Sequence, residues 1–115
     1  MLALPQAADA HQSMASLRLS QGRKEEAGAY LQSVLSILSD TRLECLPSID
    51  FRLQTSKLLL EVGQVADAIR LLRGVQKEKD YLAELWYLLC FAHRLKGDEE
   101  AVHEVRESLV QKYKY

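Results

Sequence analysis

Cysteine and proline are almost missing from this sequence of 115 residues, which has two of each. So few cysteines argue against a disulfide-stapled secreted scaffold, and neither stands in the spacing of a metal site. With only Pro5, Pro47 and five glycines, the chain lacks the residues typical of collagen-like, disordered or turn-rich all-β proteins. The simplest interpretation of the cysteines is a reducing, intracellular compartment, and a Cys45–Cys90 disulfide is the less favoured alternative.

An excess of charge of one sign is lacking too. Fifteen basic and 16 acidic residues give a formal charge of −1, so no overall field draws the chain to nucleic acid or to an anionic membrane. No apolar run approaches the ~20 residues of a membrane-spanning helix, and the apolar start is too short for a secretory signal. We therefore expect no direct nucleic-acid partner and no membrane association.

Motifs for catalysis are absent as well. The sequence has no phosphate-binding loop, no Ser-His-Asp arrangement and no dinucleotide fingerprint. His11, His93 and His103 fall on separate predicted helices, which favours packed or capping histidines over metal ligands. The acids at 98–100 suit the first turn of a helix better than a general-acid role. We predict no enzyme activity, no cofactor, no metal and no small-molecule substrate.

What the sequence does have is helical periodicity, divided by similar glycine-containing turns. Leu58 and Val62, for example, share a face at a spacing of four, and no stretch shows sustained alternation of apolar and polar residues. Turns are predicted at Gly22, Gly63 and Gly97, where glycine suits the left-handed end of a helix. The predicted helices cover residues 8–21, 24–39, 48–62, 65–78, 81–96 and 99–112.

The turn spacing indicates a repeat. Gly63 and Gly97 are 34 residues apart (97 − 63), and Gly22 and Gly63 are 41 apart (63 − 22), with the extra residues assigned to a link at 40–47. A period of 34 is that of the tetratricopeptide repeat, a pair of helices, and Trp-Tyr-Leu-Leu-Cys-Phe-Ala-His at 86–93 resembles its first helix.

This resemblance implies an all-α fold: one domain over residues 1–115 that forms a right-handed superhelical array, or solenoid, of about three helix pairs. The predicted units are 8–39, 48–78 and 81–112. Small residues are expected where helices cross, at Ala15, Ser56 and Cys90. Core residues are expected after the turns, at Ala27, Leu31, Val34, Ala68, Leu72, Val75, Val105 and Leu109.

The first helices of such arrays line a concave groove. By offset from each turn glycine, the first unit contributes Asp9, Gln12, Ser16 and Leu19. The other two units contribute Asp50, Leu53, Lys57, Leu60, Glu61, Glu84, Tyr87, Phe91, Arg94 and Leu95. Three acids face two bases in these two units, with Tyr87 and Phe91 between them. An aromatic floor with an acidic rim suits an extended peptide that carries Lys or Arg, and ordinary solvated helix surface is the alternative.

Three segments carry a narrower resemblance. They are Leu-Pro-Ser-Ile-Asp-Phe-Arg at 46–52, Lys-Leu-Leu-Leu-Glu-Val-Gly at 57–63 and Ala-Glu-Leu-Trp-Tyr-Leu-Leu at 83–89. These segments resemble the dedicated assembly chaperones of ribosomal protein four of the large subunit, whose repeat groove binds a long basic loop. The resemblance implies a protein-binding chaperone that shields a basic segment of a ribosomal protein during ribosome assembly, in the cytoplasm and nucleus.

The two ends of the chain leave another function open. Terminal repeats normally carry a polar outer face, whereas the last predicted helix and its tail hold Val110 and Tyr113. Residues 1–10 also lack a preceding helix pair. We expect either a fragment of a longer protein or an end covered by a partner. The alternative function is therefore a structural subunit of a larger complex, held through its uncapped end.

Overall fold

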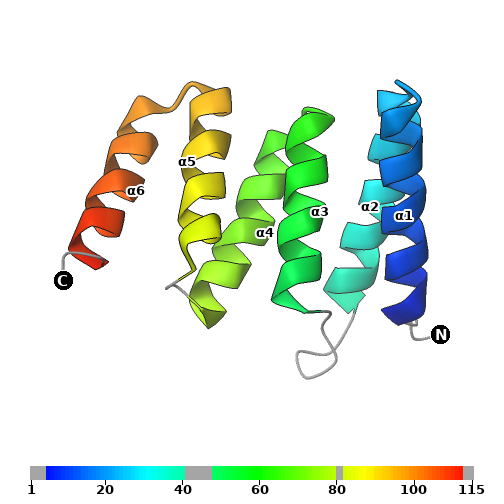
Figure 1. Ribbon diagram of the computed structural model, residues 1–115, viewed down its shortest axis with the longest axis horizontal. Helices are drawn as coiled ribbons and strands as arrows, with labels where there is room; N and C mark the ends of the chain where they lie inside the picture. Colours follow the sequence, from blue (N-terminus) through cyan, green and yellow to red (C-terminus); the bar gives the residue numbers. More distant parts are fainter. Residues whose placement is uncertain (1–4, 41–47, 80–81, 113–115) are drawn as a thin grey trace.

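Six α-helices and no strand make up the described part of the chain, as the resemblance predicted (Figure 1). The structure is a computed structural model that describes residues 5–40, 48–79 and 82–112. The helices are α1 (Pro5–Ser20), α2 (Lys24–Asp40), α3 (Ile49–Glu61), α4 (Val65–Glu78), α5 (Ala83–Lys96) and α6 (Glu99–Lys112). The largest difference from prediction is at α1, which begins at residue 5 instead of 8. Most of the predicted link, residues 41–47, lies outside the described residues.

The turns within the pairs form where the glycines predicted them. Gly22, Gly63 and Gly97 have φ of 75°, 87° and 81°, in the left-handed region that other residues reach only at a cost. After Gly97, the amide of Asp98 donates to the carbonyl of His93 at 3.0 Å, which closes α5. The Asp98 carboxylate accepts from the amide of Ala101 at 3.1 Å and so begins α6.

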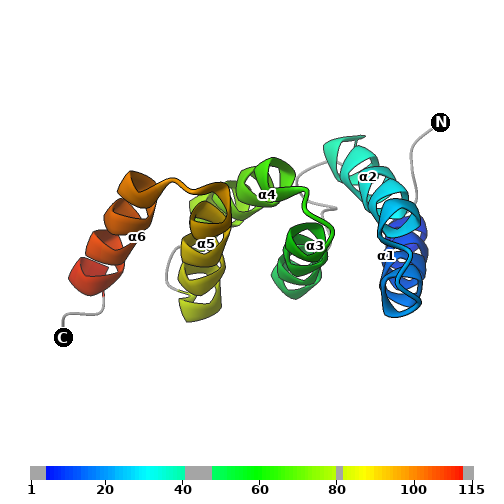
Figure 2. The same ribbon diagram turned by 90° about the horizontal axis from the view of Figure 1, so that it is seen from above.

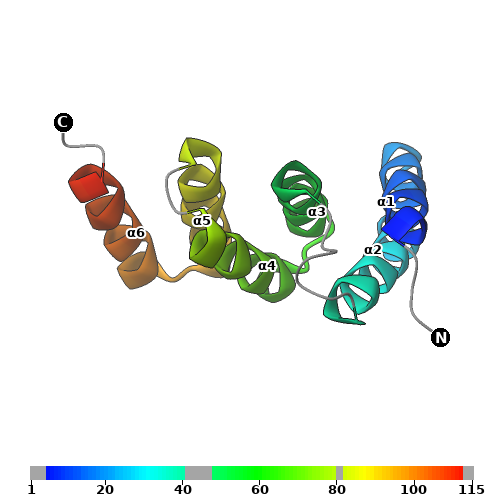
Figure 3. The ribbon, with the colours of Figure 1, turned by 90° about the horizontal axis from the view of Figure 1, so that it is seen from below.

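The helices stand as three pairs in a row along the longest axis of a molecule that measures 44 × 34 × 18 Å (Figure 1). Seen from above and from below, α1, α3 and α5 lie on one side, with α2 and α4 on the other (Figures 2 and 3). Packing is closest within the pairs α1–α2, α3–α4 and α5–α6 and between α4 and α5. Helix α2 approaches α3 at far fewer positions. The right-handed superhelical path implied by the resemblance stays a prediction.

The hydrophobic core is shared by the helix pairs, and leucines are the largest side chains fully buried in it. The core positions predicted after the first two turns are all buried completely: Ala27, Leu31, Val34, Ala68, Leu72 and Val75. In the third pair, Val105 is buried and Leu109 packs partly against the core. Ala15 and Ser56 are fully buried small residues as predicted, whereas Cys90 is only half-buried.

A polar contact holds α1 against α3. The Gln12 side-chain amide donates to the carbonyl of Phe51 at 3.0 Å and to the hydroxyl of Thr55 at 2.8 Å. Gln12 was predicted to line the groove; its side chain is half-buried and its amide group is engaged between two helices, so its place in the lining stays a prediction. The first and second pairs are close enough at this point for one side chain to bridge them.

A second polar contact joins α2 to α4 near the start of α4. The Gln32 amide donates to the Gln64 carbonyl oxygen at 2.5 Å and to the Asp67 carboxylate at 2.9 Å. Gly28 makes room here, since a Cβ at this position would lie 2.5 Å from the Gln64 side-chain nitrogen. Polar side chains therefore add to the shared hydrophobic core in joining the first two pairs.

Candidate functional site

Helix α3 leaves only a narrow stripe accessible, because α1, α2, α4 and α5 all contact it. The stripe consists of Asp50, Gln54, Lys57 and Glu61, which recur at spacings of four, three and four along the helix. Leu53 was predicted to belong to the groove lining. It is only 3% exposed and lies in the hydrophobic core, so this expectation is corrected. Gln54, which was not predicted to line the groove, is exposed on this stripe in its place.

Helix α5 exposes a row of large apolar side chains. Tyr87, Phe91 and Leu95 are 68%, 42% and 50% exposed and recur every four residues, so they lie along one face. Single exposed apolar residues are common on proteins, but a contiguous row of three marks a surface that another molecule can cover. This row is the most distinctive feature of the face formed by α3 and α5.

A hollow of about 390 Å³ lies between this row and α3. Its lining is Lys57, Leu60, Glu61, Tyr87, Leu88, Phe91 and Leu95. Leu60 and Leu88 are nearly buried and form its floor. The hollow thus brings together six of the predicted groove residues: Lys57, Leu60, Glu61, Tyr87, Phe91 and Leu95. Leu88 was not predicted to line the hollow, because a leucine with core spacing looks like any other core residue.

The charges around the hollow differ from the predicted acidic rim. Lys57 and Glu84 form an ion pair across α3 and α5, both about half exposed, and so neutralise each other. Glu61 is exposed and has no ion-pair partner among the described residues. Asp50 lies in the first turn of α3, away from the hollow. Arg94 lines a separate hollow with α6. One uncompensated carboxylate, that of Glu61, therefore remains at the rim.

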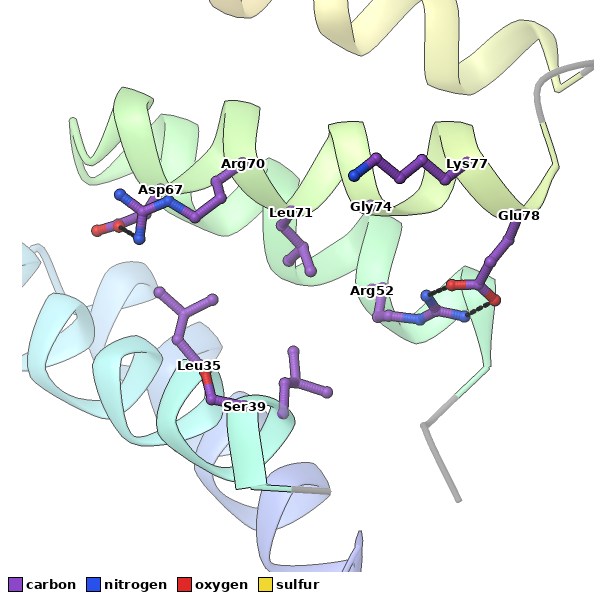
Figure 4. A pocket seen from close by; sticks show the side chains of 10 residues that line it. Leu35, Ser39, Arg52, Asp67, Arg70, Leu71, Gly74, Lys77 and Glu78 are labelled. Carbon is purple, nitrogen blue, oxygen red and sulfur yellow. Dashed lines mark hydrogen bonds and ion pairs between the residues drawn. The ribbon is translucent and has the colours of Figure 1, made fainter. Parts of the chain in front are cut away.

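A larger hollow, about 560 Å³, opens between α2 and α4 on the other side of the molecule (Figure 4). Leu35, Leu38 and Leu71 supply apolar walls. At one end, the guanidinium of Arg52 donates two hydrogen bonds to the carboxylate of Glu78, one of them 3.0 Å long. These bonds, together with the charge of Arg52, hold the pKa of Glu78 below its ordinary value. This hollow was not predicted, because its lining comes from helices of two different pairs.

The described residues offer little for other chemistry. In residues 5–40, 48–79 and 82–112, no three His, Cys, Asp or Glu side chains converge as a metal site. Cys90 is a free thiol in this part of the chain, and Cys45 lies outside it.

Across the same three stretches, every helix is too short or too polar to cross a bilayer.

Comparison with known proteins gives two relatives, although no family model matches the chain. The chain is 36% identical over 110 residues to a Schizosaccharomyces pombe protein named probable assembly chaperone of rpl4. That match covers 85% of this chain and 33% of the relative. A protein of the same name from Emericella nidulans is 33% identical over 90 residues, covering 76% of this chain and 24% of the relative.

The chain therefore spans a third or less of the length of these curated relatives. The similarity extends over most of this chain, well beyond the three segments that first indicated it. The predicted resemblance to assembly chaperones of a ribosomal protein is confirmed as a similarity in sequence, for a chain whose described residues form helix pairs with one exposed apolar row.

Proposed function

We propose that this chain is a protein-binding array of three tetratricopeptide-like helix pairs that acts as an assembly chaperone for rpl4. The names of the two fungal relatives support the client, and the 34-residue spacing of the left-handed glycines Gly63 and Gly97 supports the repeat. The observation on which the binding role chiefly rests is the exposed row Tyr87, Phe91 and Leu95 beside the hollow. A monomer gains nothing in stability from leaving such a row in water.

The proposed mechanism is shielding of a basic segment. An extended segment would lie across α3 and α5, with the aromatic rings beneath it and a Lys or Arg of the segment on Glu61. Covering a basic segment lowers its non-specific attraction to nucleic acid, which depends on free positive charge. The role is non-catalytic and needs no cofactor. It suits the cytoplasm and nucleus, where a ribosomal protein is made and assembled.

A binding assay with purified rpl4 tests this proposal. We expect a complex that weakens as salt is raised, because part of the attraction is between exposed charges. Tyr87→Ala should weaken it about tenfold, and Glu61→Gln about two- to fivefold. Glu25→Gln removes an equal charge from α2, outside the hollow, and should leave affinity unchanged. Equal binding by all three variants would contradict the proposed site.

A second candidate function has one observation in its favour. Val110 of α6 is a large exposed apolar residue at the opposite end of the row of pairs from α1. A structural subunit of a larger complex would use this end, so Val110→Asp would break its assembly while Tyr87→Ala would not. Tyr113, the other residue of the predicted uncapped end, lies outside the described residues.

A further inference from the structure

We propose that the hollow between α3 and α5 selects one large apolar side chain of the bound segment, with a Lys or Arg beside it on Glu61. The recognised segment is then a mixed apolar and basic motif instead of a run of bases. This inference rests on the proposed function and makes its binding site more specific. It follows from the apolar lining of the hollow and from the ion pair that already occupies Lys57 but not Glu61.

The interior of the hollow is apolar on several sides. Leu60 and Leu88 form the floor, and Tyr87, Phe91 and Leu95 stand beside it. A volume of about 390 Å³ lies within the ~300–1,000 Å³ of pockets that hold small ligands, so it has room for a leucine or phenylalanine side chain. A cation inserted here would lose water and find no carboxylate at the floor, which makes it a poor occupant.

The rim places charge recognition at one point. Lys57 lines the hollow with its ammonium group held by Glu84, so that pair offers no net negative charge to a client. The ammonium would also repel a client base that passed close to it. Glu61, one helical turn further along α3, has no such partner among the described residues. A client cation is therefore favoured beside Glu61 and disfavoured beside Lys57.

The relative size of the ion-pair and apolar contributions to affinity decides which of them sets specificity. An exposed ion pair such as Glu61 with a client lysine changes affinity by about fivefold at most. Transfer of a large apolar side chain from water into the hollow changes it by about tenfold or more. The apolar anchor therefore dominates, and the neighbouring base fixes the register of the segment along α3.

Fluorescein-labelled peptides of equal length and charge provide the test, with binding to the full chain followed by fluorescence anisotropy. The charge-only peptide spaces lysines with glycine and serine, and the anchor peptide replaces one serine next to a lysine with phenylalanine. We expect the anchor peptide to bind about tenfold more tightly, with a preference that persists at raised salt. Phe91→Ala should reduce this preference several-fold.

Val110→Ala is the matched control, since it removes exposed apolar surface from α6 and should leave the preference intact. Circular dichroism of each variant checks that helix content is unchanged. Equal affinity for the two peptides, with both weakened by Glu61→Gln, would overturn the apolar anchor and leave the proposed function standing. Tight binding of rpl4 with no binding of either peptide would also overturn the apolar anchor. Failure of rpl4 and both peptides to bind would overturn the proposed function itself.

Discussion

At the scale of single residues, glycine has two different roles in this chain. Gly97 adopts φ of 81° at the end of α5, where a side chain would be strained. Gly74 lies inside α4 with ordinary helical geometry, and a Cβ there would meet nothing within 4 Å. The same substitution should therefore have opposite effects at the two positions.

We predict that Gly97→Ala lowers the free energy of unfolding by about 1 kcal/mol, because alanine resists the left-handed conformation. Gly74→Ala should raise it by about 0.5–1 kcal/mol, because alanine is the better helix former. Urea denaturation of both variants beside the parent chain measures the difference. Two changes of the same sign would show that the Gly97 turn is not the constraint we describe.

His93 is the residue whose protonation state the fold most clearly controls. It is 6% exposed, and its Nε2 lies 3.3 Å from a guanidinium nitrogen of Arg73, joining α5 to α4. Burial lowers the pKa of His93, and the positive charge of Arg73 lowers it further. The imidazole is therefore neutral in the folded protein at neutral pH, as the packed histidine predicted from the sequence would be.

This lowered pKa predicts that acid destabilises the fold through His93. Below about pH 6.5, the histidine of the unfolded chain takes up a proton before that of the folded chain does. The contribution of neutral His93 to the free energy of unfolding is fully present above this pH. It is lost as pH falls toward the lower pKa of the folded chain. Denaturation between about pH 7 and 5 should show a smaller loss for His93→Gln than for the parent chain. Parallel pH profiles would contradict the assignment.

At the scale of helices, two ion pairs connect neighbouring elements in different surroundings. Arg52 and Glu78 join α3 to the end of α4, with the Arg52 side chain 7% exposed and Glu78 37% exposed. Lys57 and Glu84 join α3 to α5 in the open. Neither pair could be inferred from the sequence, because the partners are 26 and 27 residues apart and meet only when the helices pack.

We predict that Glu78→Gln lowers the free energy of unfolding by about 1 kcal/mol. This is less than for a fully buried pair, because water still reaches Glu78. Lys57→Gln, which breaks the exposed pair, should change it by under about 0.5 kcal/mol. Since Arg52 lowers the pKa of Glu78, this contribution is present above about pH 4.5 and is lost as pH falls through the lowered value. Urea denaturation of both variants at neutral and acidic pH measures these changes. Equal losses in the free energy of unfolding for the two variants would contradict the role given to burial.

At the scale of the whole molecule, the helices differ in how much of their surface is buried. The central helices α3 and α5 contain fully buried leucines such as Leu59, Leu85 and Leu89. Helix α6 buries only Val102 and Val105 among its described residues and packs chiefly on α5. In arrays of helix pairs, stability comes from each unit and its immediate neighbours, so an end element opens more easily than a central one.

We predict that amide hydrogen exchange is slower in α3 and α5 than in α6. The difference should follow from local opening of α6 without global unfolding. Exchange followed by mass spectrometry, with segments assigned after proteolysis, measures it at helix resolution. Uniform protection across the helices would indicate a single cooperative unit instead.

The sequence by itself determined the features that depend on neighbours along the chain. The six helices, the left-handed turns at Gly22, Gly63 and Gly97 and the buried positions that follow the first two arise from helical periodicity and backbone chirality. Both act over a few residues and can therefore be predicted from the sequence. The alignment of Tyr87, Phe91 and Leu95 on one face belongs here too, since a spacing of four is enough to predict it.

Only the tertiary structure decided what lies between helices. Helix packing buried Leu53, the ion pair with Lys57 neutralised Glu84, and the placement of α2 beside α4 left a hollow that no local pattern encodes. The physical reason is the same in each case. The burial and the charge of a side chain depend on the distance and orientation of elements that are remote in sequence, and small changes in helix packing reassign both.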